Sequence, residues 1–102
     1  MVPKAISDKV LTNAPFDVEQ ATSLLAALAD PARYEMVRLI MHRWWSLHSL
    51  HEHMGISRNK ANRQMKIICE AGIARARRKG RVIYYCSDSE AVARIIAHLK
   101  DL

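Results

Sequence analysis

The sequence predicts a mainly helical domain with one β-hairpin close to its C-terminal end, and three observations lead to this fold class. Apolar residues recur with helical spacing from Asp17 onward. After Gly72 the spacing changes to alternation, and it returns to the helical period after Ser87. Only three glycines and 6 % aromatic residues are present, a composition that disfavours an all-β protein.

Length and composition limit the class of protein. A chain of 102 residues, half of them hydrophobic, is expected to form one core. We expect a flexible N-terminal arm over residues 1–16 and a single domain over residues 17–102. No apolar run approaches the ~20 residues of a membrane span, and the first residues lack the layout of a secretion signal. Because Cys69 and Cys86 are too few for a disulfide framework, we expect a cytoplasmic protein without a membrane partner.

The first two helices are predicted from their caps and apolar faces. Asp17 is an N-cap residue with Gln20 three positions on, and the helix that it begins ends before Asp30. Its apolar positions are Leu24, Leu25 and Leu28. Asp30 caps a second helix with Pro31 in its first turn, where proline is tolerated. This helix extends to about His42 and is apolar on most sides, so we expect it at the centre of the fold.

A short helix, a turn and a capped polar helix follow one another. The short helix spans residues 46–54, and Gly55 lies in the turn. Ser57 is the N-cap of the next helix, which runs through about Ala71 and ends at Gly72. The inward positions of that helix are Ala61, Met65 and Ile68. This order is typical of a helix-turn-helix. The adjacent Trp44 and Trp45, which lie before it, are expected to take part in hydrophobic packing.

A hairpin and a final helix complete the pattern. Residues 73–77 alternate, residues 78–81 are expected to turn, and residues 82–86 are mostly β-branched and aromatic. Ser87 or Asp88 caps a last helix with an apolar stripe. The order α-α-α-α-β-β-α, with a basic hairpin directly after the helix-turn-helix, predicts a winged helix-turn-helix.

The positive charge is concentrated in one segment. The chain has a net charge of +6, yet residues 58–81 contain nine basic residues and one acid, Glu70, a balance of +8 that leaves −2 for the rest. Such a segment suits a polyanion, because each cation near a phosphate releases condensed counterions. Double-stranded DNA is therefore the expected partner.

The candidate DNA contacts lie on the capped polar helix and on the hairpin. They are Ser57, Arg58, Asn59, Lys60, Asn62, Arg63, Gln64 and Lys66 on the helix, and Arg77, Arg78, Lys79 and Arg81 on the hairpin. Arginine and amide side chains suit base edges, so Arg58, Asn59, Asn62 and Gln64 are the expected base readers. We expect Lys66 to meet phosphate, and Arg78 and Arg81 to meet the backbone or the minor groove. A merely solvated helix face is the alternative.

Five motifs occur in order and without a gap between residues 24 and 86. They are LADPAR at residues 28–33, MGIS at 54–57, RQMK at 63–66, EAGI at 70–73 and GRVIYY at 80–85. These motifs resemble ALADPTR, LLGLS, RHLK, EAGLV and GRWVYY of the ArsR/SmtB family of bacterial repressors. The resemblance implies a homodimer built from the first and last helices, with two recognition helices that read a palindromic operator.

The expected dimer interface combines the apolar positions of these two helices. It consists of Leu24, Leu28, Val92, Ile95, Ile96 and Leu99. The residues also favour oligomerisation without the resemblance. A small monomer buries only a modest share of its surface, and this chain has apolar helices at both ends.

The metal sites that the resemblance implies are not matched in this sequence. The arsenic-type Cys-x-Cys corresponds to Ser46-Leu47-His48, without a thiolate pair. The zinc-type Asp-x-His-x10-His-x-x-Glu corresponds to Asp88-x-Glu90-x7-His98-x-x-Asp101, which is three residues shorter and lacks the first histidine. We therefore expect no metal or other cofactor, and no release of DNA by zinc or arsenite through these sites.

The histidines and cysteines allow more than one role, either in packing or in binding a ligand. Of the local cluster His42, His48, His51 and His53, only His48 and His51 share a helix face, and two imidazoles are an incomplete metal site. Surface packing or a DNA-backbone contact is the expected role. Cys69 is expected among core positions and Cys86 at the end of the second strand, both as free thiols.

Three other functions stand beside a DNA-binding repressor. One is a redox- or metal-responsive variant that uses the two cysteines or the last-helix ligands. Another is an architectural winged-helix protein without operator specificity. An enzyme is disfavoured, because the sequence has neither a catalytic constellation nor a glycine-rich phosphate loop.

Overall fold

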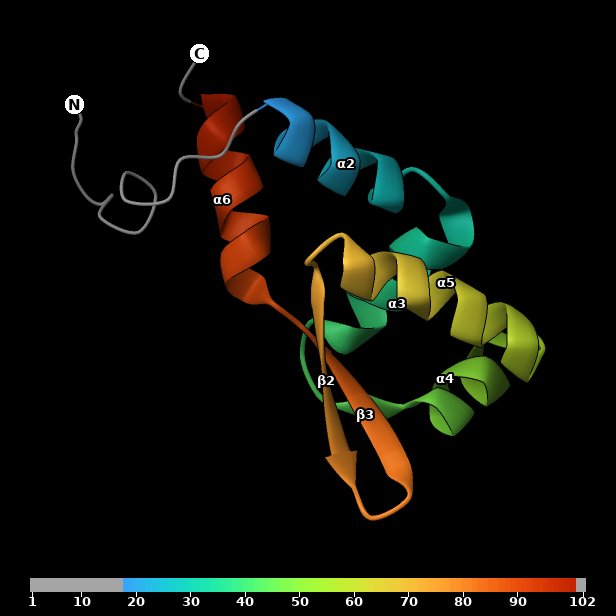
Figure 1. The fold of residues 1–102 in the computed structure, drawn as a ribbon. Helices are drawn as coiled ribbons and strands as arrows, with labels where there is room; N and C mark the ends of the chain where they lie inside the picture. The colour runs from blue at the N-terminus through green and yellow to red at the C-terminus, as the bar shows by residue number, and fades with distance from the viewer. Residues whose placement is uncertain (1–17, 101–102) are drawn as a thin grey trace.

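The computed structural model describes residues 18–100 (Figure 1). Its elements are α2 (Val18–Leu28), α3 (Pro31–Ile40), β1 (Trp45–Ser46), α4 (Leu47–Met54), α5 (Arg58–Glu70), β2 (Ala74–Lys79), β3 (Val82–Ser87) and α6 (Ser89–Lys100). The expected arm over residues 1–16, the Asp17 cap and residues 101–102 lie outside the described residues. The helix order and the hairpin match the predicted winged helix-turn-helix.

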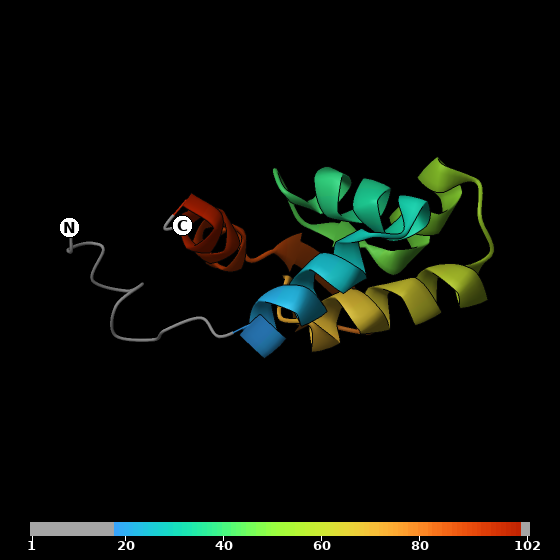
Figure 2. The ribbon, with the colours of Figure 1, turned by 90° about the horizontal axis from the view of Figure 1, so that it is seen from above.

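Helix α3 lies at the centre of the fold, as its apolar sequence predicts. It contacts α2, α5 and β3, and its Met36 and Ile40 have no exposed surface. Figures 1 and 2 show α4 and α6 at opposite ends of the molecule, with α6 beside α2. The largest fully buried side chains are Met36, Ile40, Leu50, Met65, Ile68 and Ile73. Within residues 18–100, every helix is too short or too polar to cross a membrane.

The corner between α2 and α3 is closed by two charged side chains. The Asp30 carboxylate accepts hydrogen bonds from the backbone N–H groups of Ala32 and Arg33, which confirms Asp30 as the N-cap. The Arg33 guanidinium donates to the Ala27 carbonyl at 2.6 Å and to the Gln64 side-chain oxygen at 2.8 Å. Arg33 therefore provides a hydrogen-bond donor for a backbone carbonyl at the C-terminal end of α2, and it links α2 and α3 to α5.

Replacing Arg33 with alanine is expected to lower the free energy of unfolding by about 2 kcal/mol, because part-buried acceptors lose a charged donor. Arg38→Ala is the control on the same helix. Arg38 is exposed and pairs with Glu35 at 3.2 Å, so its loss should change stability by at most about 0.5 kcal/mol. Urea denaturation measures both variants. Equal losses would show that the Arg33 hydrogen bonds do not hold the corner.

A third strand joins the hairpin, and the sequence analysis did not predict it. The two-residue β1 pairs antiparallel with β3, so the sheet order is β1-β3-β2, with Trp45 opposite Tyr85. The Trp45 indole N–H donates to the Leu39 carbonyl at 2.9 Å, and the side chain is buried. This strand ties the middle of β3 to α3 and α4.

The hairpin turn is narrower than predicted. Strand β2 extends to Lys79, which pairs with Val82, so the turn consists of Gly80 and Arg81 alone rather than residues 78–81. Gly80 has φ +65°, a conformation that glycine adopts without steric cost. The cap of α6 is Asp88, whose carboxylate accepts from the Glu90 N–H at 3.1 Å, whereas Ser87 is buried at the end of β3.

Candidate nucleic-acid interface

Helix α5 presents one polar face to solvent. Its N-cap is Ser57, whose hydroxyl oxygen accepts from the Lys60 N–H at 3.0 Å, as predicted. The predicted inward residues Ala61, Met65 and Ile68 have at most 1 % of their surface exposed. The predicted DNA-contact residues that are exposed on this helix are Arg58, Asn59, Lys60, Asn62, Arg63 and Lys66, and Glu70 is exposed at its C-terminal end. The core contacts thus fix the rotation of α5 and hold six polar candidates outward.

A groove runs between the start of α5, α4 and the hairpin. Its lining residues are Leu47, His48, Arg58, Asn59, Asn62, Arg81, Val82, Ile83 and Tyr85. The groove brings Arg58, Asn59 and Asn62 of α5 together with Arg81, which belongs to the hairpin turn and is distant from them in sequence. Most of the expected base readers and one wing cation therefore share one concave surface.

Gln64 lies on a different flank of α5 from Asn62. Two residues apart on a helix are separated by ~200°, so both side chains cannot face the same groove. Gln64 is half-buried, and its side-chain oxygen accepts from Arg33 of α3. This differs from the sequence analysis, which counted Gln64 among the base readers. We expect Gln64 to hold α5 against α3 instead, because Arg33 already occupies its acceptor.

Arg77 packs on an aromatic ring rather than at the hairpin tip. Its guanidinium carbon lies 4.3 Å from the centroid of Trp44, and that of Arg75 lies 5.8 Å away. Such cation–π contacts restrain both groups. Sequence reasoning missed the role of Trp44, because the partner lies more than 30 residues further along the chain. Both of these arginines are exposed, as are Arg78, Lys79 and Arg81 further along the hairpin.

The two cysteines are free thiols in a half-buried setting. Burial is the main cause that raises the pKa of Cys69, and the carboxylate of Glu70 adds to it. A raised pKa lowers the thiolate fraction at neutral pH, which is the opposite of what a reactive thiol needs. Burial also raises the pKa of Tyr85, with a further contribution from Cys69, while Arg58 acts in the opposite direction.

The apolar positions of α2 and α6 divide into two sets. Leu24 and Ile95 are 3 % and 4 % exposed within the single chain, so they have little surface left for a partner. Leu28 and Val92 are half-buried, whereas Ile96 and Leu99 are 49 % and 50 % exposed. The sequence analysis placed all six on the interface. The fold covers Leu24 and Ile95 itself, because α6 packs its Ile95 side toward the core.

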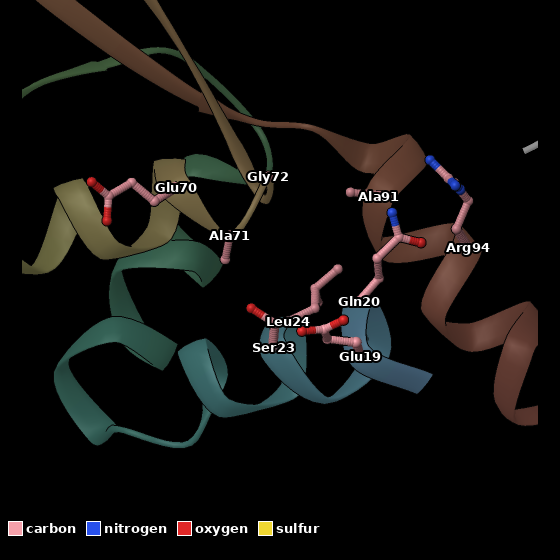
Figure 3. Close-up of a pocket in the computed structure, with 9 residues that line it drawn as sticks. All are labelled: Glu19, Gln20, Ser23, Leu24, Glu70, Ala71, Gly72, Ala91 and Arg94. Carbon is pink, nitrogen blue, oxygen red and sulfur yellow. The ribbon is translucent and has the colours of Figure 1, made fainter. Parts of the chain in front are cut away.

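A second hollow lies where α2, the end of α5 and α6 meet (Figure 3). Its lining residues are Glu19, Gln20, Ser23, Leu24, Glu70, Ala71, Gly72, Ala91 and Arg94. The zinc-type positions Asp88, Glu90 and His98 do not line it. Among residues 18–100, these three positions also form no group of three potential metal ligands.

The chain is similar in sequence to a nodulation protein and in structure to that protein and to transcriptional regulators. It is 27 % identical over 86 residues to the nodulation protein NolR of Rhizobium meliloti, covering 84 % of this chain and 70 % of that protein. The crystal structure of NolR from Sinorhizobium fredii matches with a TM-score of 0.69 and 22 % identity, covering 99 % and 95 % of the two chains. An ArsR-like transcriptional regulator from Rhodococcus sp. RHA1 matches with a TM-score of 0.77 and 22 % identity, covering 81 % and 78 %. No family model matches the chain.

These comparisons confirm the fold class and the resemblance noted in the sequence. Two of the similar structures are named as an ArsR family transcriptional regulator and an ArsR-like transcriptional regulator. In its winged helix-turn-helix fold, the chain is like the ArsR-family transcriptional regulators.

Proposed function

We propose that this protein is a sequence-specific DNA-binding transcriptional repressor that acts as a homodimer on a palindromic operator in the cytoplasm. The observation that carries the proposal is the groove in which Arg58, Asn59 and Asn62 of α5 face Arg81 of the hairpin. A helix of this kind presents its N-terminal residues to the major groove, and the three α5 residues lie at that end.

The residues of this surface divide into two roles. Arg58, Asn59 and Asn62 have donors and acceptors that suit base edges. Lys66, which is exposed one turn after Asn62, and the hairpin cations Arg78 and Arg81 suit phosphate or the minor groove. Similarity in fold to an ArsR-like transcriptional regulator supports DNA as the partner of this surface.

Selection of binding sites from random DNA, followed by titration with competitor DNA, tests the proposal. A symmetric pair of half-sites about 10–10.5 base pairs apart or a multiple of this spacing is expected. The selected site should bind roughly 10³-fold or more tighter than random DNA at physiological salt. An architectural protein would bind every sequence within a few-fold, and that result would overturn operator recognition.

A further inference from the structure

We infer that His48, His51 and Glu52 of α4 form a binding site for a divalent transition-metal ion such as Zn²⁺, and that the bound ion strengthens binding to DNA. The metal site stands on the geometry of α4 alone. Its effect on DNA rests on the function proposed above.

The three side chains converge on one face of α4. Their spacing of i, i+3 and i+4 places them on neighbouring turns, and their potential ligand atoms all lie within 4.8 Å of one another. The two imidazole centroids are 5.2 Å apart, and His48 Nε2 lies 3.7 Å from a Glu52 carboxylate oxygen. Ligands of tetrahedral zinc are separated by roughly 3.4 Å. The exposed side chains of His48 and Glu52 can close that difference by small rotations.

The His51 ring is held in the orientation that a ligand needs. Its Nδ1 lies 3.2 Å from the Ile56 carbonyl oxygen, which can only accept, so Nδ1–H is the donor. The neutral ring then has its free lone pair on Nε2. A backbone carbonyl that fixes the tautomer in this way is the usual second partner of a metal-binding histidine.

The donor set and its position favour a cation. Two imidazole nitrogens and one carboxylate suit Zn²⁺ with a water molecule as fourth ligand. His51 and Glu52 lie in the last two turns of α4, where the helix dipole favours positive charge. The sequence analysis counted only two aligned imidazoles, and Glu52 is the third ligand that it missed. His53 does not join them, because its ring packs on Trp45 with centroids 5.3 Å apart.

The site adjoins the surface proposed to bind DNA. His48 lines the groove together with Arg58, Asn59 and Asn62. Without metal and with neutral imidazoles the three side chains carry a charge of −1, and a bound dication changes it to +1. Phosphates within a Debye length of about 8–10 Å respond to that change. Zinc should therefore raise DNA affinity rather than release DNA, and the effect should shrink as salt is added.

Zinc titration of the full chain without a histidine tag tests the site directly. Competition with a chelating dye is expected to show one Zn²⁺ per chain, and His51→Gln and Glu52→Gln should each weaken binding by about tenfold or more. The amide of His51→Gln retains an N–H for the Ile56 carbonyl, and circular dichroism checks its folding. His42→Ala is the control, an exposed histidine outside the cluster that should bind zinc as the wild type does. The site is overturned if the wild type binds no stoichiometric zinc, or if the control loses as much affinity as the two variants.

Fluorescence anisotropy with the selected operator, in zinc or in chelator, tests the effect on DNA. A several-fold gain in affinity is expected for the wild type and none for His51→Gln. A wild type that binds zinc but whose DNA affinity is unchanged or lower would overturn the coupling and leave the site in place. Absence of DNA binding under every condition would instead overturn the proposed function, while the dye titration would still decide the site.

Discussion

Replacing Ile96 with glutamate is expected to convert the proposed homodimer into a monomer. Ile96 is 49 % exposed on α6, as is Leu99 at 50 %, and α6 packs beside α2 in the fold. In a two-fold interface each substitution occurs twice. Because about half of Ile96 is already covered in the single chain, burial of the rest contributes about 0.8–1.5 kcal/mol per side chain. Losing it twice, and burying two carboxylates in its place, should weaken dimerisation by at least about tenfold. Sedimentation at micromolar concentration measures the change.

The burial of the α6 side chains shows why Ile96, and not its neighbour Ile95, is the residue to replace. Ile95 is 4 % exposed in the single chain, so a glutamate there would place a charge in the core and disturb folding itself. Tyr34→Glu is the control, because Tyr34 is an exposed apolar residue on α3 and not on α2 or α6. It should leave the oligomeric state unchanged. A dimeric Ile96→Glu variant would show that α6 does not form the interface.

Replacing Asn62 with alanine is expected to relax the base preference at one operator position. Asn62 lines the groove between α5 and the hairpin, where its amide suits adenine. The loss should be about 1–3 kcal/mol at that position, and other positions should keep their preference. Site selection and anisotropy with single-base operator variants measure this effect.

Lys66→Ala and Gln64→Ala are matched comparisons on the same helix. Lys66→Ala should weaken all sequences alike and lower the slope of affinity against salt by about one unit. Gln64→Ala should lower stability through Arg33 and leave the selected sequence unchanged. A swapped outcome for Asn62 and Lys66 would mean that α5 is docked in another rotation. If neither variant changes DNA binding, α5 is not the recognition element.

Much of the fold could be predicted from the sequence because its signals act over a few residues. Asp30 and Ser57 accept hydrogen bonds from backbone N–H groups two or three positions on, and both caps are present as predicted. Gly55 and Gly72 have positive φ at or just after the ends of α4 and α5. The concentration of cations in residues 58–81 likewise follows from the sequence alone.

The tertiary structure decided what covers each helix face. Apolar spacing identifies Ile95 and Ile96 equally, and only the packing of α6 buries one and exposes the other. Helical spacing places Gln64 on a different flank of α5 from Asn62, and only the tertiary structure shows that Arg33 of α3 is the partner of that flank. Local patterns fix which residues share an element and a face, because caps and periodicity are set within one or two turns. The partner of that face is set by contacts between distant segments, such as Trp44 with Arg77, which a pattern within one segment does not specify.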